Sequence, residues 1–397
     1  MKPLRISAYT VTSAIGIGLQ ASFNSIRDRK SGLKPCSFAP RLGTFSGMVA
    51  GLETLPVRED LSEFDCRNNR LAQLGLQQDD FVAKVDLAQK KYGSDRIAVI
   101  LGTSTSGIQE TELAFVNRDK KTDLLPASFN YSTTHNLYAT SDFVRRYLGL
   151  TGHTSMISTA CSSAAKAFAS AWRMMKTGLC DAVVVGGVDS LALNTLYGFT
   201  SLELVSATPC RPCAPDRSGI SIGEAAGFAL LEWPEQSGSE SNFFLKGYGE
   251  SSDAYHMSTP RPDGSGAAMA MAAAIERAAI DPAEIDYINM HGTASDVNDA
   301  MEDKAITRVV GATTPCSATK GWTGHTLGTA GMLEAAISLL ALEHGLIPGT
   351  QNTETIDPAF TSEILLQNRP AELRYVLSNS FGFGGSNCSL LLGKDCD

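Results

Sequence analysis

The sequence predicts an α/β sheet protein, because short strand-like runs alternate with longer helix-like runs along the chain. In addition, a turn of small residues followed by an apolar helix occurs once in each half of the chain. With 397 residues, of which 43% are hydrophobic and 19% charged, the chain is long enough for a large core. Such a core is built either as one big domain or as two fused halves.

The expected elements of the first half follow one another in a regular order. Residues 6–11 indicate a strand, 20–29 a helix, 96–101 a strand, 141–148 a helix and 155–158 a strand. The last strand leads into Cys161, and the apolar helix pattern that follows ends at Gly178. Residues 181–187 then form a short apolar run that is typical of a fully buried strand.

The second half repeats part of this order. Gly324 and His325 begin a turn of small residues, which is followed by an apolar helix over residues 332–342. This weak duplication predicts two related halves, residues 1–235 and 243–397. The polar segment 234–242 contains Gly and Ser and is expected to be a joint rather than a cleavable linker, because the halves should share one core.

Charge and hydropathy exclude several classes of protein. The formal net charge of −9 argues against generic nucleic-acid binding, which needs a basic surface. No run of about 18 apolar residues occurs, so no membrane span is expected. The first five residues resemble the start of a secretory signal, but Ser7, Thr10 and Thr12 interrupt any apolar segment, and we interpret the stretch as the first strand.

Nine cysteines, an odd number without a repeating framework, indicate a reducing cytoplasm rather than a disulfide scaffold. Cys210 and Cys213 have CxxC spacing, but no second pair completes a zinc site. A plain loop is expected there, and no metal.

Cys161 is a candidate nucleophile. It stands among small residues, Ser158-Thr159-Ala160-Cys161-Ser162-Ser163, at a strand-to-helix junction. That position gives a substrate carbonyl room to approach, and the helix N-terminus favours negative charge on sulfur. The alternative is a buried structural thiol, which is the commoner role of cysteine.

Two of the six histidines are candidates for the same site. His291 and His325 stand beside glycine at the ends of strand-like runs, where a side chain can be held at a site. Alternatively, His291 caps a strand and His325 is a satisfied histidine at a helix start. Taken together with Cys161, the two histidines indicate a thiol acyl-transfer centre.

The chain resembles the β-ketoacyl-acyl-carrier-protein synthases of the thiolase superfamily, the decarboxylating Cys-His-His condensing enzymes. The resemblance covers nearly the whole chain, and its motifs occur in order as Val184-Val185-Gly186-Gly187, Arg211-Pro212, Asp216-Arg217-Ser218-Gly219, Gly223-Glu224, His291-Gly292-Thr293, Asn298-Asp299 with Glu302, Lys320, Gly324-His325 and Ser380-Phe381-Gly382-Phe383-Gly384-Gly385-Ser386-Asn387. It implies duplicated βαβαβαββ halves in a five-layered αβαβα core.

The resemblance implies a role for each candidate residue. Cys161 would carry the acyl group as a thioester, while His291 and His325 would polarise the malonyl carbonyl during loss of carbon dioxide. Phe383 would gate the acyl pocket, and its backbone N–H would form an oxyanion hole with that of Cys161. A turn with a core aromatic is the other interpretation of Phe383.

Further residues are assigned by the same resemblance. Lys320 and Glu302 would support the histidines from behind as an ion pair, unless they are unrelated surface charges. Thr293 and Ser295 resemble the hydroxyls that bind the phosphopantetheine arm or the malonyl group, although turns also favour these residue types.

Two departures from the fatty-acid pattern leave the acyl substrate open. By the resemblance Thr105 is also a candidate for substrate binding, and it stands where an apolar residue near the acyl tunnel, often contributed across a dimer, is usual. Cys213-Ala214-Pro215 replaces Phe-Asp in the Arg-Pro motif. They favour a specialised pathway, for instance polyketide-like or aryl-polyene assembly, in which the synthase pairs with a chain-length-controlling relative.

The predicted partner is an acyl carrier protein, which is itself acidic, so that docking needs a local basic patch. The candidates are Arg67, Arg70, Lys120 and Lys121, with a solvated charged face as the alternative. A homodimer, or a heterodimer with a chain-length-factor subunit, is expected in the cytoplasm.

The predicted function is therefore 3-oxoacyl-acyl-carrier-protein synthase, with substrates carried on phosphopantetheine and no other cofactor. Two alternatives stay open: an acyltransferase or thioesterase of the same fold that performs no condensation, and a chain-length-determining subunit. The two histidines argue against the first, and Cys161 argues against the second.

Overall fold

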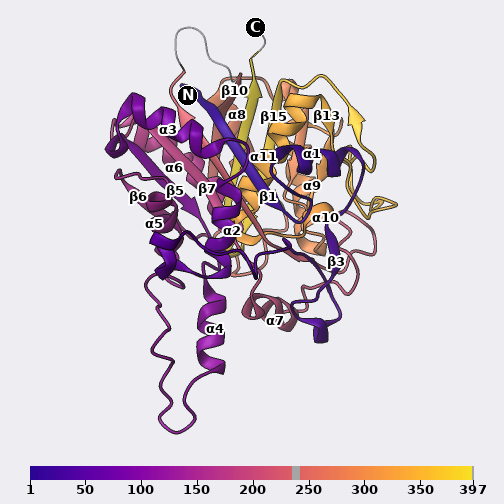
Figure 1. Cartoon of the computed structure of the whole chain (residues 1–397). Coiled ribbons are helices and arrows are strands. Elements are labelled where there is room, and N and C mark those ends of the chain that lie inside the picture. Colours follow the sequence, from indigo (N-terminus) through magenta and orange to yellow (C-terminus); the bar gives the residue numbers. More distant parts are fainter. Residues whose placement is uncertain (235–241, 396–397) are drawn as a thin grey trace.

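The computed structural model describes residues 1–234 and 242–395, and it has five layers of helices and sheet (Figure 1). One long mixed sheet contains strands from both halves of the chain, in the order β12-β11-β15-β16-β10-β1-β9-β7-β5-β6. Its strands are β1 (Leu4–Ser13), β5 (Ile97–Gly102), β6 (Thr154–Ile157), β7 (Ala182–Asp189), β9 (Ala225–Glu232), β10 (Phe243–Ser252), β11 (Tyr287–Met290), β12 (Cys316–Ala318), β15 (Tyr375–Gly382) and β16 (Ser386–Lys394).

The two halves of this sheet have the same topology. If these ten strands are numbered within their own half, both halves have the order 3-2-4-5-1 from the outer edge to the junction. In each half the three outer strands are parallel and the next two are antiparallel. The halves join where β1 pairs with β10, with Leu4 opposite Leu245. The predicted duplicated fold is confirmed.

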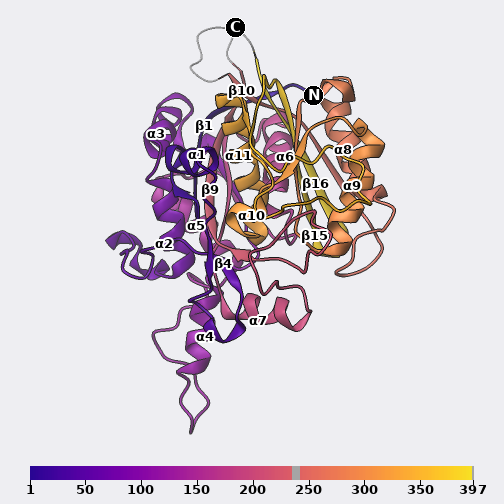
Figure 2. The same cartoon turned by 90° about the vertical axis from the view of Figure 1, so that its right-hand side faces the viewer.

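Helices form the other three layers. They are α1 (Leu19–Arg27), α2 (Arg67–Leu76), α3 (Phe81–Tyr92), α4 (Ile108–Val116), α5 (Leu137–Tyr147), α6 (Ser163–Lys176), α7 (Leu193–Ser201), α8 (Ser265–Ala278), α9 (Asp296–Val310), α10 (Lys320–Thr323) and α11 (Ala330–His344). Helices α2, α3 and α5 cover the outer face of the first half-sheet, while α8 and α9 cover the second (Figure 2).

The middle layer consists of α6 and α11, which pack against each other between the two half-sheets. Residues 330–342 of α11 are all buried, because sheet and helix surround them on every side. These helices occupy equivalent places, since α6 follows the third strand of the first half and α11 the third strand of the second. Their N-terminal ends therefore lie at the same edge of the core.

Short elements complete the chain. They are β2 (Gly16–Ile17), β3 (Leu33–Pro35), β4 (Phe45–Gly47), β8 (Ile222–Gly223), β13 (Leu346–Ile347) and β14 (Arg369–Pro370), with the 3-10 turns η1 (Pro40–Leu42), η2 (Glu59–Phe64), η3 (Ser94–Arg96), η4 (Pro282–Glu284), η5 (Leu327–Thr329) and η6 (Phe383–Gly385). Helix α4 and residues 117–136 project from the body as an arm (Figure 1).

The predicted strands and helices are present, with ends shifted by a few residues. Most of the predicted joint, residues 235–241, lies outside the described residues, so that the proposed limits of the halves at 235 and 243 stay a prediction. Within the described ranges, no helix has both the length and the apolar character that a membrane crossing requires.

Candidate active site

Cys161 lies between β6 and α6, in a turn with strained backbone. The preceding residue, Ala160, has φ 53°, in the left-handed region that side-chain-bearing residues rarely adopt. The hydroxyl of Ser163 holds this turn, because it accepts a hydrogen bond from the Thr159 N–H at 2.9 Å and donates to the Ala160 carbonyl. The turn places the sulfur at the N-terminus of α6, with 7% of the residue exposed.

The two histidines come from neighbouring strands of the other half. His291 directly follows β11, and His325 follows β12 after the short helix α10. Because β11 and β12 are parallel, their carboxyl ends meet at one edge of the sheet. His325 is fixed there by backbone bonds to β8 and its flank, from its N–H to Ser221 and from Gly223 to its carbonyl. Both histidines are buried.

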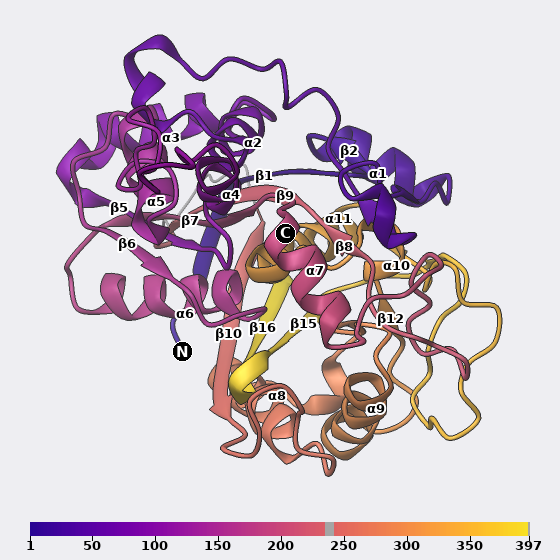
Figure 3. The ribbon, with the colours of Figure 1, turned by 90° about the horizontal axis from the view of Figure 1, so that it is seen from below.

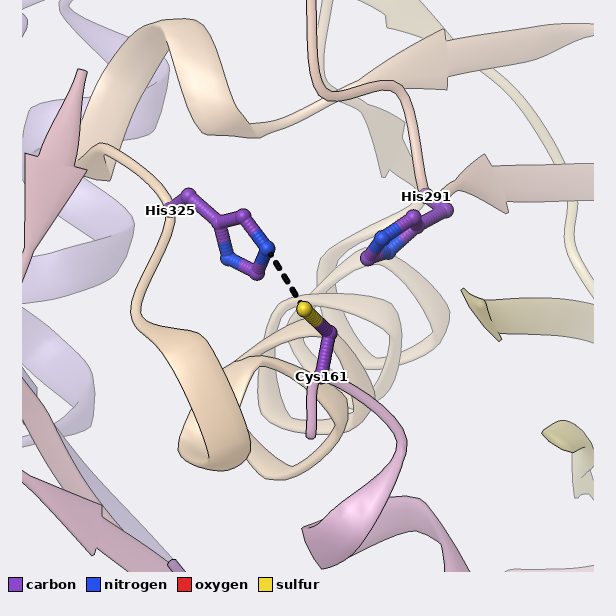
Figure 4. A group of neighbouring side chains, drawn as sticks. All are labelled: Cys161, His291 and His325. Carbon is purple, nitrogen blue, oxygen red and sulfur yellow. Dashed lines mark hydrogen bonds between the residues drawn. The ribbon is translucent and has the colours of Figure 1, made fainter. Parts of the chain in front are cut away.

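The three side chains converge on one point (Figure 4). His325 Nε2 lies 3.1 Å from the sulfur of Cys161. The closest ring nitrogen of His291, His325 Nε2 and the sulfur all lie within 4.8 Å of one another. The imidazole rings stand nearly perpendicular, at 86°, with centroids 5.4 Å apart. The structure thus brings together the nucleophile and both histidines that were predicted from sequence.

Hydrogen bonds at the back of each ring assign its tautomer. The backbone N–H of Leu327 donates to His325 Nδ1 at 3.2 Å, and the ammonium group of Lys320 lies 3.2 Å from His291 Nδ1. Since each Nδ1 accepts a hydrogen bond, each Nε2 carries the proton. Burial lowers the pKa of both histidines well below the ordinary value, and the charge of Lys320 lowers it further.

Both imidazoles are therefore neutral and turn a donor N–H toward the sulfur. This arrangement suits an oxygen that gains negative charge, which needs preorganised donors. It does not suit a metal ion, because a metal ligand must offer a nitrogen lone pair at Nε2.

Cys161 rests as a thiol rather than a thiolate. Burial raises the pKa of this thiol to about 11, while Lys320 and a hydrogen bond from the Phe383 backbone act in the opposite direction. Burial outweighs the effects of Lys320 and Phe383. The N-terminus of α6 also favours the anion, as expected from sequence. The thiol proton must therefore leave during acyl transfer itself.

The predicted ion pair of Lys320 with Glu302 is wrong. Lys320 instead pairs with the buried carboxylate of Glu334, on α11. Glu302 accepts hydrogen bonds from the backbone N–H groups of His291 and Gly292, each at 2.8 Å. Burial raises the pKa of both carboxyl groups to about 7. Glu334 and Glu302 both lie behind His291. Glu334 holds the imidazole ring through Lys320, whereas Glu302 holds the backbone.

A small cavity of about 70 Å³ opens onto these groups. Its lining includes the three central residues together with Thr293, Ser295, Phe199, Phe381 and Phe383. The hydroxyl groups of Thr293 and Ser295 lie 2.9 Å apart on its wall, and their predicted contact with substrate stays a prediction.

Phe383 stands at the mouth of this cavity. The residue is 37% exposed, and the centroid of its ring lies 5.8 Å from that of Phe199 on α7. The following residue, Gly384, has φ 79° and no atom close to where a side chain would begin. A Cβ on Gly382 would lie 2.8 Å from the Thr159 carbonyl, so that the loop packs closely beside the Cys161 turn.

Thr105 binds a buried carboxylate of its own chain. The cavity lining does not include it, and its hydroxyl and its N–H both bind Asp189, each at 2.7 Å. Thr105 therefore does not line the cavity of its own chain, and its predicted contact with substrate near the acyl tunnel, across a dimer, stays a prediction. The hydroxyl satisfies a buried carboxylate of its own chain, whereas an apolar residue would have no such bond.

Two of the four predicted docking cations are already used within the chain. Arg67 is buried and binds Glu224 through two nitrogens, at 2.7 and 2.9 Å, and Glu53 at 2.7 Å. It is therefore not available at the surface, and its predicted docking role is wrong. Arg70 is partly exposed and forms a two-pronged bond with Asp65.

Lys120 and Lys121 are exposed on the arm, beyond α4. Viewed from below, α4 and α7 lie near each other on this face of the molecule (Figure 3), and the two helices are in contact. Since Phe199 of α7 lines the cavity, these two lysines stay candidates for docking.

Sequence reasoning missed two buried carboxylates near the site, Glu334 and Asp189. A signal existed for Glu334, because a single acidic residue inside an otherwise apolar helix needs a buried partner. Asp189 ends a strand of buried residues, so the same argument predicts that it too needs a buried partner.

A duplicated five-layer fold, a cysteine at a helix N-terminus and two histidines that donate to one point define a cysteine-dependent acyltransferase. Models of the beta-ketoacyl synthase N-terminal and C-terminal domains match residues 71–237 and 243–354. The chain belongs to the beta-ketoacyl synthase family, whose members are condensing acyltransferases.

Relatives with similar sequence carry the same activity in their names. The chain is 30% identical to 3-oxoacyl-acyl-carrier-protein synthase 2 of Vibrio cholerae, over 98% of each chain. It is 38% identical to the mitochondrial 3-oxoacyl-acyl-carrier-protein synthase of Arabidopsis thaliana, over 64% of this chain and 59% of that relative.

Among solved structures, the chain resembles the ketosynthase ApeO of Xenorhabdus doucetiae, determined in complex with its chain length factor ApeC. The TM-score is 0.89 and the identity 39%, over 99% of this chain and 98% of the other. The ishigamide ketosynthase/chain length factor also has a TM-score of 0.89, at 26% identity over the whole of both chains.

Proposed function

We propose that this condensing enzyme joins a Cys161-bound acyl group to a malonyl unit carried by an acyl carrier protein. In the first step the sulfur of Cys161 attacks the acyl thioester of the incoming carrier. A new thioester forms on Cys161, and the pantetheine thiolate leaves and takes up the thiol proton. The backbone N–H of Phe383, which points at the sulfur, would bind the carbonyl oxygen together with the N–H of Cys161.

The second step is decarboxylation of malonyl-carrier protein. The bond between the carboxylate and the methylene carbon breaks, carbon dioxide leaves, and the electron pair forms an enolate on the thioester. The N–H groups of His291 and His325 would donate to the enolate oxygen. The single observation that carries this proposal is that both Nε2 atoms are donors beside the sulfur.

In the third step the enolate carbon attacks the acyl carbonyl on Cys161. The tetrahedral oxyanion is held by the two backbone N–H groups and collapses to 3-oxoacyl-carrier protein, with the Cys161 sulfur as leaving group. No resident cofactor enters this scheme, since phosphopantetheine brings both substrates. Thr293 and Ser295 would bind that arm on the cavity wall.

We further propose that the acyl chain is polyketide-like, for instance an aryl polyene, and that the partner subunit is a chain length factor. The resemblance to ApeO, determined with such a factor, supports this proposal. Several large apolar side chains are exposed on the arm and at its base, and they support a subunit interface there. These residues are Leu113, Phe115, Val116, Leu124, Tyr131, Leu137 and Tyr138. A homodimer and a cytoplasmic location stay predictions from the sequence.

The two alternative functions have weaker support. An acyltransferase or thioesterase without condensation has no use for two neutral imidazole donors that face one oxygen. A purely structural chain-length subunit has no use for a cysteine held in a strained turn beside them.

The test is the intact mass of the chain after incubation with carrier proteins that bear short, long and aryl-unsaturated acyl groups. Wild type should gain the mass of one acyl group and Cys161→Ala should not, and the acyl group loaded best would indicate the pathway. If no primer loads, the measurement is repeated with a co-purified partner subunit. Failure there too would reject the condensing role.

A further inference from the structure

The buried carboxylate of Asp189 joins three segments around the active site. It ends β7, and Oδ1 accepts hydrogen bonds from the backbone N–H groups of Ser104 and Thr105, at 2.8 and 2.7 Å. The hydroxyl groups of Thr103 and Thr105 reach the same oxygen, at 3.0 and 2.7 Å. The other oxygen, Oδ2, accepts a bond from the Thr329 hydroxyl at 3.0 Å.

Thr329 closes the turn that fixes His325. This turn, residues 326–329, includes Leu327, whose N–H donates to His325 Nδ1. Leu327 has φ 53°, a left-handed conformation that is strained in a residue with a side chain. Such a turn persists only where its surroundings hold it in place.

The turn is held in place by the residues that Asp189 binds. Thr329 is tied to the carboxylate directly. Gly328 packs against residues 103–104, since an added Cβ would lie 2.7 Å from the Ser104 nitrogen. Asp189 therefore holds residues 103–105, against which the turn packs, through Oδ1. It holds Thr329, at the end of the turn, through Oδ2.

We propose that Asp189 and Thr329 are positioning residues, which act through Leu327 to hold His325 as the tautomer with a proton on Nε2. This inference rests on the proposed function, because it explains how one of the two donors is kept ready for the enolate. Neither residue lines the cavity or touches the reacting atoms.

The first variant is Thr329→Val, which keeps the shape of the side chain and removes the hydroxyl. Malonyl-carrier decarboxylation should fall about tenfold in kcat, with KM unchanged, in keeping with the 10- to 100-fold cost of losing an orienting partner. Thr329→Ser should restore the rate to within about twofold, because it restores the donor.

The chain offers a matched control in Thr326→Val. Thr326 lies in the same turn and is equally buried, but its hydroxyl has no hydrogen-bond partner. This variant should keep the wild-type rate. Equal losses in the Thr326 and Thr329 variants would mean that general packing, rather than the bond to Asp189, matters, and would overturn the proposal.

The second readout is the side-chain ¹⁵N spectrum of His325, assigned by its absence in His325→Gln. Wild type and Thr326→Val should show the proton on Nε2, whereas Thr329→Val should show a mixture of tautomers. A folded Thr329→Val with wild-type rate and spectrum would reject the positioning role. Because the spectrum needs no substrate, it decides this inference even if wild type does not decarboxylate malonyl-carrier protein.

Discussion

Lys320 Nζ lies 3.2 Å from His291 Nδ1, so that a buried ammonium donor keeps the imidazole proton on Nε2. The same ammonium is paired with the carboxylate of Glu334. Both charges are almost completely buried, at 2% and 3% side-chain exposure. An ion pair in this environment is costly to break, since the remaining charge loses its partner.

We expect Lys320→Met to lower malonyl decarboxylation by about 10- to 100-fold, because His291 loses the donor that fixes its tautomer. It should also lower the free energy of unfolding by about 3–5 kcal/mol, because the carboxylate of Glu334 is left without a partner. Denaturant unfolding and carbon dioxide release measure the two effects.

The double variant Lys320→Met/Glu334→Leu separates these effects. It removes both charges, so that most of the stability should return while the rate stays low. Recovery of the rate together with stability would show that Lys320 acts on the fold and not on His291.

Substitutions of His325 and of Cys161 should affect different steps of the reaction. His325→Ala removes a donor to the enolate, and we expect decarboxylation to fall by about 10²- to 10³-fold, the usual cost of one such donor. Cys161→Ala removes only the acyl acceptor and should still release carbon dioxide from malonyl-carrier protein. Full activity in His325→Ala would refute its assigned role.

Alkylation of Cys161 should depend steeply on pH. Burial raises the pKa of this thiol to about 11, so that the reactive thiolate is the minor form below that pH. The rate of labelling by iodoacetamide should therefore rise about tenfold per pH unit between roughly pH 7 and 10. Peptide mass spectrometry would follow this site alone. A plateau near pH 8 would contradict the raised pKa.

Lys320→Met provides the control for this measurement. The positive charge of Lys320 lowers the pKa of the Cys161 thiol, so its removal should raise that pKa further. Labelling should become slower than in wild type at each pH below the pKa.

Substitution of the basic residues should divide them into two groups. Arg67→Ala leaves the fully buried Glu224 without its two-pronged partner and should lower the free energy of unfolding by about 3–5 kcal/mol.

Charge reversal of Lys120 and Lys121 should leave the melting temperature unchanged. If these lysines meet an acidic carrier protein, the apparent KM for that carrier should rise at low salt, and the difference from wild type should shrink in high salt, which screens the charges. An unchanged KM would remove them from the interface.

The central residues of the site were predictable because glycine and strand ends mark places where a polar side chain is held. Cys161, His291 and His325 each stand at such a place, and the structure joins them. The position of Thr293 and Ser295 on the cavity wall follows from the same argument, since they lie just beyond His291.

The partners of the buried charges were not predictable in the same way. Sequence shows that Lys320 needs a carboxylate, but not that α11 brings Glu334 to it while Glu302 turns toward the backbone. The hydroxyl of Thr105 likewise finds Asp189, a residue 84 positions away, instead of the cavity. Such choices depend on how helices and loops are oriented in three dimensions.

The middle layer of the fold has a consequence for how the chain unfolds. Helix α6 belongs to the first half and α11 to the second, yet each packs against elements of both halves. Either half on its own would leave the apolar face of its middle-layer helix in water, at a cost of about 25 cal/mol per Å². We therefore expect the two matched family domains to melt in a single cooperative transition, and neither to fold alone.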